Sequence, residues 1–333
     1  MIKNSEFFFP KLKNIVFLGN LEKNEEKFKE INENFSLKTE IITSPDQNKN
    51  NKIKTFENLN KEFENYISKK YNINETLFIS IASRWIIKKN QIENFFKNNL
   101  INSHPTRLPI DAGSGGFSWQ IMRGDRICNQ LFHLVDENLD TGPIIFNKKS
   151  IFPNHCKVPN DYYKHHYDEI IKFYREFIKK LVSGDRFKLK YQTDYLATYN
   201  PRLLTDLHGW IDWSQNSINI TRFISAFDDP YKGASTFINE KKVRIKKIQM
   251  HGGEIPNHPF SSGIILRNDK DWVVVSTIDE NHKILIEEVL DEKGNNIVDQ
   301  LKVGDRFFTP NEKLEEARKI RVKFGPKGIK SKK

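Results

Sequence analysis

Cysteine is scarce in this sequence, with only Cys128 and Cys156 among 333 residues. The two are too far apart to form a Cys-x-x-Cys pair, and no secretory-type leader is recognisable at the start. So few thiols exclude a fold that depends on disulfides and indicate a reducing compartment. We therefore expect a cytoplasmic protein without structural disulfides.

Long hydrophobic runs are also missing. The apolar stretches at 264–266 and 272–275 are far shorter than the roughly 20 residues that a helix needs to cross a bilayer. The sequence therefore predicts no membrane-spanning helix.

Two kinds of cofactor motif are absent as well. The first apolar run, 14–19, ends in a single glycine, so the G-x-G-x-x-G pattern that would indicate a nicotinamide cofactor is missing. The spacing of His155, Cys156, His165 and His166 matches no common zinc pattern. We expect no metal, and we interpret the helical face at 165–166 as solvated.

Apolar and aromatic residues are plentiful. Hydrophobic residues make up 37% of the chain, and 25 phenylalanines supply bulky core side chains. This length and composition predict two globular domains. The formal charge of +11 suggests an anionic partner, but residues 311–333 carry nine basic residues against three acidic ones. More than half of the charge therefore lies in this tail, and we interpret the rest as a solvated surface.

Alternating apolar runs and helical patterns indicate the fold class. Runs at 14–19, 77–82 and 130–135 are separated by polar stretches, with a helix expected from 22 to 31 and another, at three- and four-residue spacing, from 161 to 183. This order predicts an α/β fold: a Rossmann-like, mostly parallel sheet with flanking helices. The later runs are short and separated by turns, which predicts a small OB-like β-barrel. They lie at 234–238, 242–248, 263–267, 272–277, 283–289 and 305–308.

These patterns also suggest domain boundaries. We expect a catalytic domain at 1–190, a linker at 191–213, a barrel domain at 214–312 and a basic tail at 313–333. Ser214 is placed to cap a helix that ends at Phe227. The Lys-rich end of the tail, with Gly325-Pro326, is expected to be mobile.

The polar residues that could carry chemistry lie in two segments. Residues 100–109 read LINSHPTRLP, a glycine cluster follows, and residues 136–142 read DENLDTG. The chain here resembles the formyltransferase family that uses 10-formyltetrahydrofolate, which includes methionyl-tRNA formyltransferase and the amino-sugar formyltransferases. The family signature is Asn-x-His, a Leu-Pro loop and Leu-Asp-x-Gly. Asn102 and His104 match the first element, and Asp140 follows His104 by 36 positions.

The residue types suit acyl transfer to an amine. Attack on a formyl carbon creates a negative oxygen, which an amide N–H of Asn102 and the imidazole of His104 can stabilise. The amine must also lose a proton, and His104 can carry it while Asp140 orients the ring. At a strand end, Asn-x-His directs both side chains to one face. Taken singly these motifs are common turns, but together they predict a catalytic centre of Asn102, His104 and Asp140.

The resemblance implies further ligand contacts. The segment 81–87 takes the place of the family strand and loop that pack against the pterin ring, although core packing is an alternative for two of its side chains, Trp85 and Ile86. The glycine cluster is the expected substrate loop, where Phe117 and Trp119 could stack on a sugar or base or could instead shape a flexible loop and fill the core. The implied folate contacts are Arg84, Trp85, Ile86, Leu108, Pro109, Asp136, Glu137 and Asn138; the loop residues are Gly113, Gly115, Gly116 and Phe117.

The second half is similar to the C-terminal domain of methionyl-tRNA formyltransferase and of a lipid A aminoarabinose formyltransferase, through IDWSQ at 211–215 and the segment 222–237. Residues 112–117 depart from the Arg-Gly-Ala-Ala-Pro that tRNA enzymes usually have, and their basic insertion near 35–50 is missing. We therefore expect 10-formyltetrahydrofolate as formyl donor and a nucleotide-linked amino sugar as acceptor. Methionyl-tRNA is the alternative acceptor, and a homodimer is left open. A nucleic-acid-binding protein with an inactive catalytic domain is the alternative from another class.

Overall fold

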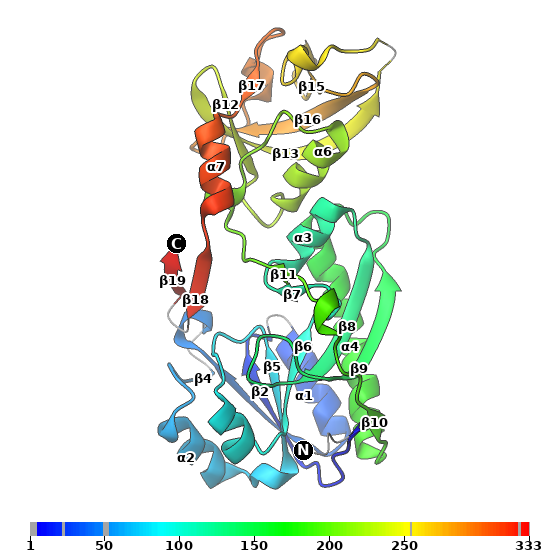
Figure 1. Ribbon diagram of the computed structural model, residues 1–333, viewed down its shortest axis with the longest axis vertical. Coiled ribbons are helices and arrows are strands. Elements are labelled where there is room, and N and C mark those ends of the chain that lie inside the picture. Colours follow the sequence, from blue (N-terminus) through cyan, green and yellow to red (C-terminus); the bar gives the residue numbers. More distant parts are fainter. Residues whose placement is uncertain (1–4, 22–23, 49–52, 254, 326–327, 333) are drawn as a thin grey trace.

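The computed structural model describes residues 5–21, 24–48, 53–253, 255–325 and 328–332. The N-terminal half is built on a seven-stranded sheet with the strand order β4-β3-β2-β5-β6-β8-β9 (Figure 1). Neighbouring strands from β4 to β6 are parallel, whereas β8 is antiparallel to both β6 and β9. The strands are β2 (Asn14–Gly19), β3 (Lys38–Thr43), β4 (Lys54–Thr55), β5 (Thr76–Ile81), β6 (Leu100–His104), β8 (Ile127–Leu134) and β9 (Ile144–Ile151).

Helices cover both faces of this sheet. Ile15 and Phe17 of β2 pack against α1 (Glu25–Asn34) and α4 (Pro159–Val182). Val16 and Leu18 pack against α2 (Lys61–Lys70) on the other face. Successive strand residues point to opposite faces, so this continuous apolar run is buried on both sides, as parallel strands require.

The C-terminal half contains a curled antiparallel sheet of six strands in the order β14-β15-β16-β13-β12-β17. Its two edges meet, because the amide of Ile265 donates to the carbonyl of Asp305 at 2.8 Å and the amide of Phe307 donates to Gly263 at 2.9 Å. The sheet is therefore curled into a barrel-like shape, and α6 (Ser217–Ala226) packs on β13. Its strands are β12 (Ala234–Ile238), β13 (Lys241–Gly252), β14 (Ile265–Asn268), β15 (Val273–Ser276), β16 (His282–Leu290) and β17 (Phe307–Phe308).

Short pairings tie the connecting segments to the two sheets. β7 (Ala112–Gly113) pairs in parallel with β11 (Tyr199–Asn200), which brings the linker against the glycine-rich loop. β1 (Glu6–Phe7) pairs with β10 (Phe187–Lys188). The linker also contains α5 (Thr205–His208), and α3 (Gly116–Arg123) packs against α6. In the described residues, short helical turns also occur at 45–47, 73–75, 91–95, 194–196, 259–261 and 298–300.

The end of the chain returns toward the N-terminal sheet. Figure 1 shows α7 (Asn311–Lys319) beside the barrel-like C-terminal sheet. It is followed by β18 (Val322–Gly325) and β19 (Gly328–Lys332), which pair as a hairpin. The described residues of this segment form a helix and a hairpin, while Pro326, which belongs to the end that was expected to be mobile, lies outside the described residues. Among the described residues, no helix combines the length and apolarity needed to cross a bilayer.

The predicted fold class is confirmed, a mostly parallel sheet with flanking helices followed by a barrel-like sheet. The helix expected at 22–31 is α1, although residues 22–23 lie outside the described residues. Ser214 does not cap the next helix: its hydroxyl donates to Asp212 at 2.5 Å. The N-cap is Asn216, whose side chain accepts from the amide of Asn219 at 2.8 Å, because helix α6 begins at Ser217.

Candidate active site

The three side chains expected to carry chemistry lie at one edge of the N-terminal sheet. Asn102 and His104 are two positions apart near the end of β6, and Asp140 lies on the loop between β8 and β9. Nδ1 of His104 is 3.8 Å from Oδ2 of Asp140. His104 is buried and Asp140 keeps 10% of its side chain exposed, so the protein encloses most of the pair and leaves a small part of the carboxylate accessible.

The hydrogen bonds of His104 show which nitrogen carries its proton. Nε2 lies 3.0 Å from the carbonyl oxygen of Asp111 and 2.9 Å from Oγ1 of Thr106. The Thr106 hydroxyl itself donates to the same carbonyl at 2.8 Å, so both neighbours act as acceptors toward Nε2. Nε2 therefore holds a hydrogen, and Nδ1, which faces Asp140, is the nitrogen left to exchange a proton.

His133, on β8, was not predicted from the sequence, yet it completes the group. Its Nδ1 donates to the carbonyl of Leu134 at 2.8 Å, and its Nε2 lies 3.1 Å from Nδ2 of Asn102 and 3.7 Å from Oδ1 of Asp140. Burial lowers the pKa of His133 from its ordinary 6.5 to about 4. The ring is therefore neutral near pH 7, and its bare Nε2 accepts one N–H of Asn102.

This contact fixes the amide of Asn102. With one hydrogen of Nδ2 donated to His133, whose Nε2 is 3.7 Å from Asp140, the second hydrogen of the same nitrogen remains as a donor. His133 is 31 positions from Asn102 in the chain, and β6 and β8 bring them opposite each other in register. A lone histidine in an apolar strand gives no functional signal by itself, which is why the sequence did not single it out.

Asp140 is held on both its side chain and its backbone. Its Oδ2 accepts the backbone N–H of Gly113 at 3.1 Å, and its carbonyl accepts Nε2 of Gln192 at 2.8 Å. The backbone of Asp140 has φ of 57°, a conformation that L-residues rarely adopt outside tight turns. The glycine-rich loop and the linker therefore both position the carboxylate.

Two of the segments expected to contact folate lie together. Nζ of Lys89, two residues beyond the segment 81–87, is 3.2 Å from Oε2 of Glu137 on the loop that carries Asp140. Ile86 is 90% exposed, so the alternative in which it is core is wrong. Arg84 donates from Nε to Asp46 at 3.0 Å, and Trp85 donates from Nε1 to the carbonyl of Glu57 at 3.1 Å.

The other expected folate contacts have structural roles of their own. The side chain of Leu108 is buried in a small apolar cluster, so only its backbone can meet a ligand, while the next residue, Pro109, is half-buried. Oδ1 of Asp136 accepts the amide of Asn138 at 3.2 Å and the hydroxyl of Thr141 at 2.7 Å. Exposed Leu139, at 62%, lies next to Asp140 and was not predicted.

The glycine-rich loop has close packing at two of its glycines. A Cβ on Gly113 would lie 2.4 Å from the carbonyl oxygen of Asn200, and one on Gly116 would lie 2.6 Å from Cγ2 of Thr106. Gly115 has φ of 75° and precedes α3. The stacking role for Phe117 is wrong: its ring is 4% exposed and packs against Tyr163 in the core, with ring centroids 4.9 Å apart.

His166 is another correction. Its Nδ1 lies 2.7 Å from Nε2 of Gln130, and its ring packs on Phe117 with centroids 5.5 Å apart, so this face of α4 is half-buried and not fully solvated. Burial lowers the pKa of His166 to about 3. Within the described part of the chain, no group of three or more His, Cys, Asp or Glu is placed to hold a metal ion.

Comparison with known proteins covers both halves. Residues 30–166 match the family model described as formyl transferase, and residues 204–300 match the formyl transferase C-terminal domain. A methionyl-tRNA formyltransferase of Prochlorococcus marinus subsp. pastoris is 26% identical over 270 residues, covering 74% of this chain and 80% of that protein. A cytosolic 10-formyltetrahydrofolate dehydrogenase of Xenopus laevis is 28% identical over 153 residues, which cover 44% of this chain and 16% of that protein.

Solved structures share the fold at low identity. A sugar 3N-formyltransferase, WlaRD, crystallised with dTDP and 5-N-formyl-THF, has a TM-score of 0.62 at 20% identity, covering 83% of this chain and 97% of its own. The N-formyltransferase of Helicobacter canadensis, crystallised with folinic acid and dTDP-3-aminofucose, has a TM-score of 0.61 at 19% identity, covering 84% and 99%. Since the two matched domain models together span more than half of the chain, the protein belongs to the formyl transferase family of enzymes.

Proposed function

We propose that this enzyme transfers the formyl group of 10-formyltetrahydrofolate to the primary amine of a nucleotide-linked amino sugar. The observation that carries the proposal is the site itself. Nδ1 of His104 lies 3.8 Å from Oδ2 of Asp140 at the sheet edge, and Asn102 is linked to the same carboxylate through His133, which is 3.1 Å from Nδ2 of Asn102 and 3.7 Å from Oδ1 of Asp140.

The arrangement accounts for every atom of the transfer. The amine nitrogen bonds to the formyl carbon, and the carbonyl oxygen becomes an anion that the free N–H of Asn102 can stabilise. His104 accepts the amine proton at Nδ1, and the resulting imidazolium faces Asp140. The same proton then goes to the folate nitrogen as its bond to the formyl carbon breaks. No proton is gained or lost overall.

Features next to the site support folate as the donor. Ile86 and Leu139 are large apolar side chains at 90% and 62% exposure, which a flat ring system could cover. They lie on the two segments joined by Lys89 and Glu137. Structures of the same fold were crystallised with 5-N-formyl-THF and with folinic acid.

Two features support a nucleotide sugar over methionyl-tRNA as acceptor. The loop at 112–117 replaces the Arg-Gly-Ala-Ala-Pro of tRNA enzymes with a glycine-rich segment, and the basic insertion near 35–50 is missing. Two solved sugar N-formyltransferases superimpose on 83% and 84% of the chain. Methionyl-tRNA stays the second candidate, because a methionyl-tRNA formyltransferase aligns with 74% of the chain.

The experiment is a direct competition between acceptors. Purified protein is incubated with 10-formyltetrahydrofolate and, in parallel, with nucleotide-linked 3-amino and 4-amino sugars or with methionyl initiator tRNA, and formylated products are quantified by mass spectrometry. We expect formylation of at least one amino sugar and none of the tRNA. Formylation of tRNA alone would overturn the acceptor assignment, whereas no formylation of either would overturn the function.

A further inference from the structure

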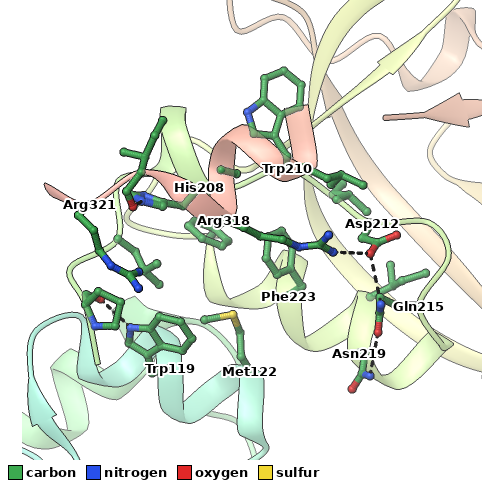
Figure 2. A pocket seen from close by; sticks show the side chains of 18 residues that line it. Trp119, Met122, His208, Trp210, Asp212, Gln215, Asn219, Phe223, Arg318 and Arg321 are labelled. Atoms are coloured by element: carbon green, nitrogen blue, oxygen red, sulfur yellow. Dashed lines mark hydrogen bonds and ion pairs between the residues drawn. The ribbon is translucent and has the colours of Figure 1, made fainter. Parts of the chain in front are cut away.

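A pocket of about 440 Å³ lies between the catalytic half and the C-terminal half of the chain. Its walls come from α3, the linker, α6 and α7 (Figure 2). Trp119 and Met122 belong to α3, Phe223 to α6 and Leu314 to α7. The volume lies in the range of small-molecule sites, and apolar walls with few polar groups are typical of them.

The pocket combines aromatic surface with one unpaired cation. Trp119 is half-buried, and its ring is fixed because Nε1 donates to the carbonyl of Pro201 at 2.9 Å. Arg318 is neutralised by Asp212 at 3.0 Å. Figure 2 shows Arg321 on the opposite side, its guanidinium near Trp119 and directed into the pocket. Among the residues that the structure describes, no acidic side chain pairs with Arg321.

The pocket adjoins the glycine-rich loop of the active site. A Cβ on Gly115 would lie 3.6 Å from Cδ1 of Trp119 and 3.7 Å from the amide nitrogen of Leu203, and both residues line the pocket. Two positions earlier, the amide of Gly113 donates to Asp140. Two Cα steps span at most about 7.6 Å, so the pocket begins within one short loop of the catalytic carboxylate.

We infer that this pocket binds the nucleotide part of the acceptor, with the base against Trp119 and Phe223 and a phosphate on Arg321. A nucleobase presents a flat π-face to aromatic side chains, and a guanidinium pairs well with phosphate. We expect the sugar of an acceptor held in this way to extend along the glycine-rich loop, whose Gly113 donates to Asp140. The inference rests on the proposed function, and it assigns a role to α7, which lies beyond the last residue matched by either family model.

Binding of free nucleotides tests the pocket without any turnover. Isothermal titration calorimetry measures the affinity of the wild type and of three variants for UDP, dTDP and GDP. Arg321→Gln removes the unpaired charge, and Phe223→Leu removes the ring but keeps an apolar side chain. Lys319→Gln is the matched control, because Lys319 is an exposed α7 residue that pairs with Glu315 and does not line the pocket. Thermal melts check that each variant is folded.

We expect the tightest of the three nucleotides to bind Arg321→Gln and Phe223→Leu at least about tenfold more weakly, and Lys319→Gln within about twofold of wild type. With the matching amino sugar conjugate, KM should rise by the same factor at unchanged kcat. Wild-type protein that binds none of the three nucleotides at about 1 mM, or variants that bind like wild type, would overturn the inference.

The steady-state arm separates this inference from the proposed function. If nucleotide amino sugars are formylated and their KM is unchanged in both pocket variants, the pocket assignment is wrong while the function stands. A second outcome is that nucleotides bind, and bind the variants more weakly than wild type, but no nucleotide amino sugar is formylated. In that case the proposed function and the acceptor assignment fail together.

Discussion

At the scale of single residues, the reaction depends on where one proton can go. Nε2 of His104 is occupied by its contact with Asp111, so proton exchange is confined to Nδ1, opposite Asp140. We predict that Asp140→Asn lowers the single-turnover rate by roughly 10²- to 10⁴-fold, because the imidazolium loses its counter-charge. Asparagine still offers an oxygen to the amide of Gly113, so the melting temperature should change little.

The matched control for this prediction is Asp185→Asn, which changes an exposed carboxylate that pairs with Lys180 after α4. It should leave the rate unchanged. Equal single-turnover rates in wild type and Asp140→Asn would show that Asp140 is not a catalytic residue.

His133 acts through another residue and is therefore a positioning residue. We predict that His133→Ala lowers kcat by about 10- to 100-fold with KM nearly constant, because the amide of Asn102 loses its acceptor and no longer holds one orientation. His133→Gln should restore part of the activity, since its amide oxygen can accept the same N–H. Similar kcat values for the Ala and Gln variants would show that His133 has only a packing role.

At the scale of elements, the short β7–β11 pairing connects the linker to the catalytic carboxylate. Gly113 has φ of 100°, and a Cβ there would lie 2.4 Å from the carbonyl oxygen of Asn200. We predict that Gly113→Ala lowers the free energy of unfolding by about 1–3 kcal/mol and also lowers kcat, because the loop must move and the amide leaves Asp140. Urea unfolding and steady-state kinetics measure the two effects.

The variant Gly184→Ala is the control that separates the effect of backbone strain from the effect of moving the loop that holds Asp140. Gly184 also has positive φ, at 81°, but an added Cβ there would meet nothing within 4 Å. This variant should lose stability through backbone strain alone and keep full kcat. Loss of kcat in both variants would mean that backbone strain anywhere lowers kcat, and that the effect at Gly113 does not depend on its bond to Asp140.

Two substitutions test which residue caps the N-terminus of helix α6. Asn216→Ala should lower the free energy of unfolding by about 1 kcal/mol, because the amide of Asn219 loses its side-chain acceptor at the helix N-terminus. Ser214→Ala is the control, since Ser214 bonds to Asp212 outside the helix. Denaturant midpoints of the two variants give the comparison, and an equal or larger loss for Ser214→Ala would contradict it.

At the scale of the whole molecule, the buried His133 and the partly buried His166 make folding sensitive to acid. Burial lowers the pKa of His133 to about 4 and of His166 to about 3, both below the ordinary 6.5. Between these values the unfolded chain binds protons that the folded chain does not. The stabilisation is therefore fully present above pH 6.5 and is lost as pH falls, by up to about 1.4 kcal/mol per pH unit for each histidine.

Urea titrations between pH 7.5 and about 4.5 measure this dependence. The double variant His133→Gln, His166→Gln should be less stable at pH 7.5 but show a much flatter pH dependence than wild type. A slope equal to that of wild type would assign the acid sensitivity to other groups.

Regular local patterns in the sequence predicted much of the fold. The three- and four-residue spacing at 161–183 predicted the helix observed as α4, Pro159–Val182, and the apolar run at 14–19 predicted β2. Asn102 and His104 share a strand face because side chains alternate in direction along it, and this needs only the sequence. The helix α7 was not predicted, because the charge of residues 311–333 indicates solvent exposure but does not reveal a helix that contacts α5 of the linker.

The sequence by itself determined the residue types of the site and the strand end that carries two of them. Only the tertiary structure decided that His133 holds Asn102, that Gly113 holds Asp140, that Phe117 is core and that α7 closes a pocket beside Trp119. The reason is physical: a strand or helix pattern depends on neighbours a few residues away. Burial, tautomer and hydrogen-bond partner depend on segments such as β6 and β8, which are distant in sequence and adjacent only after folding.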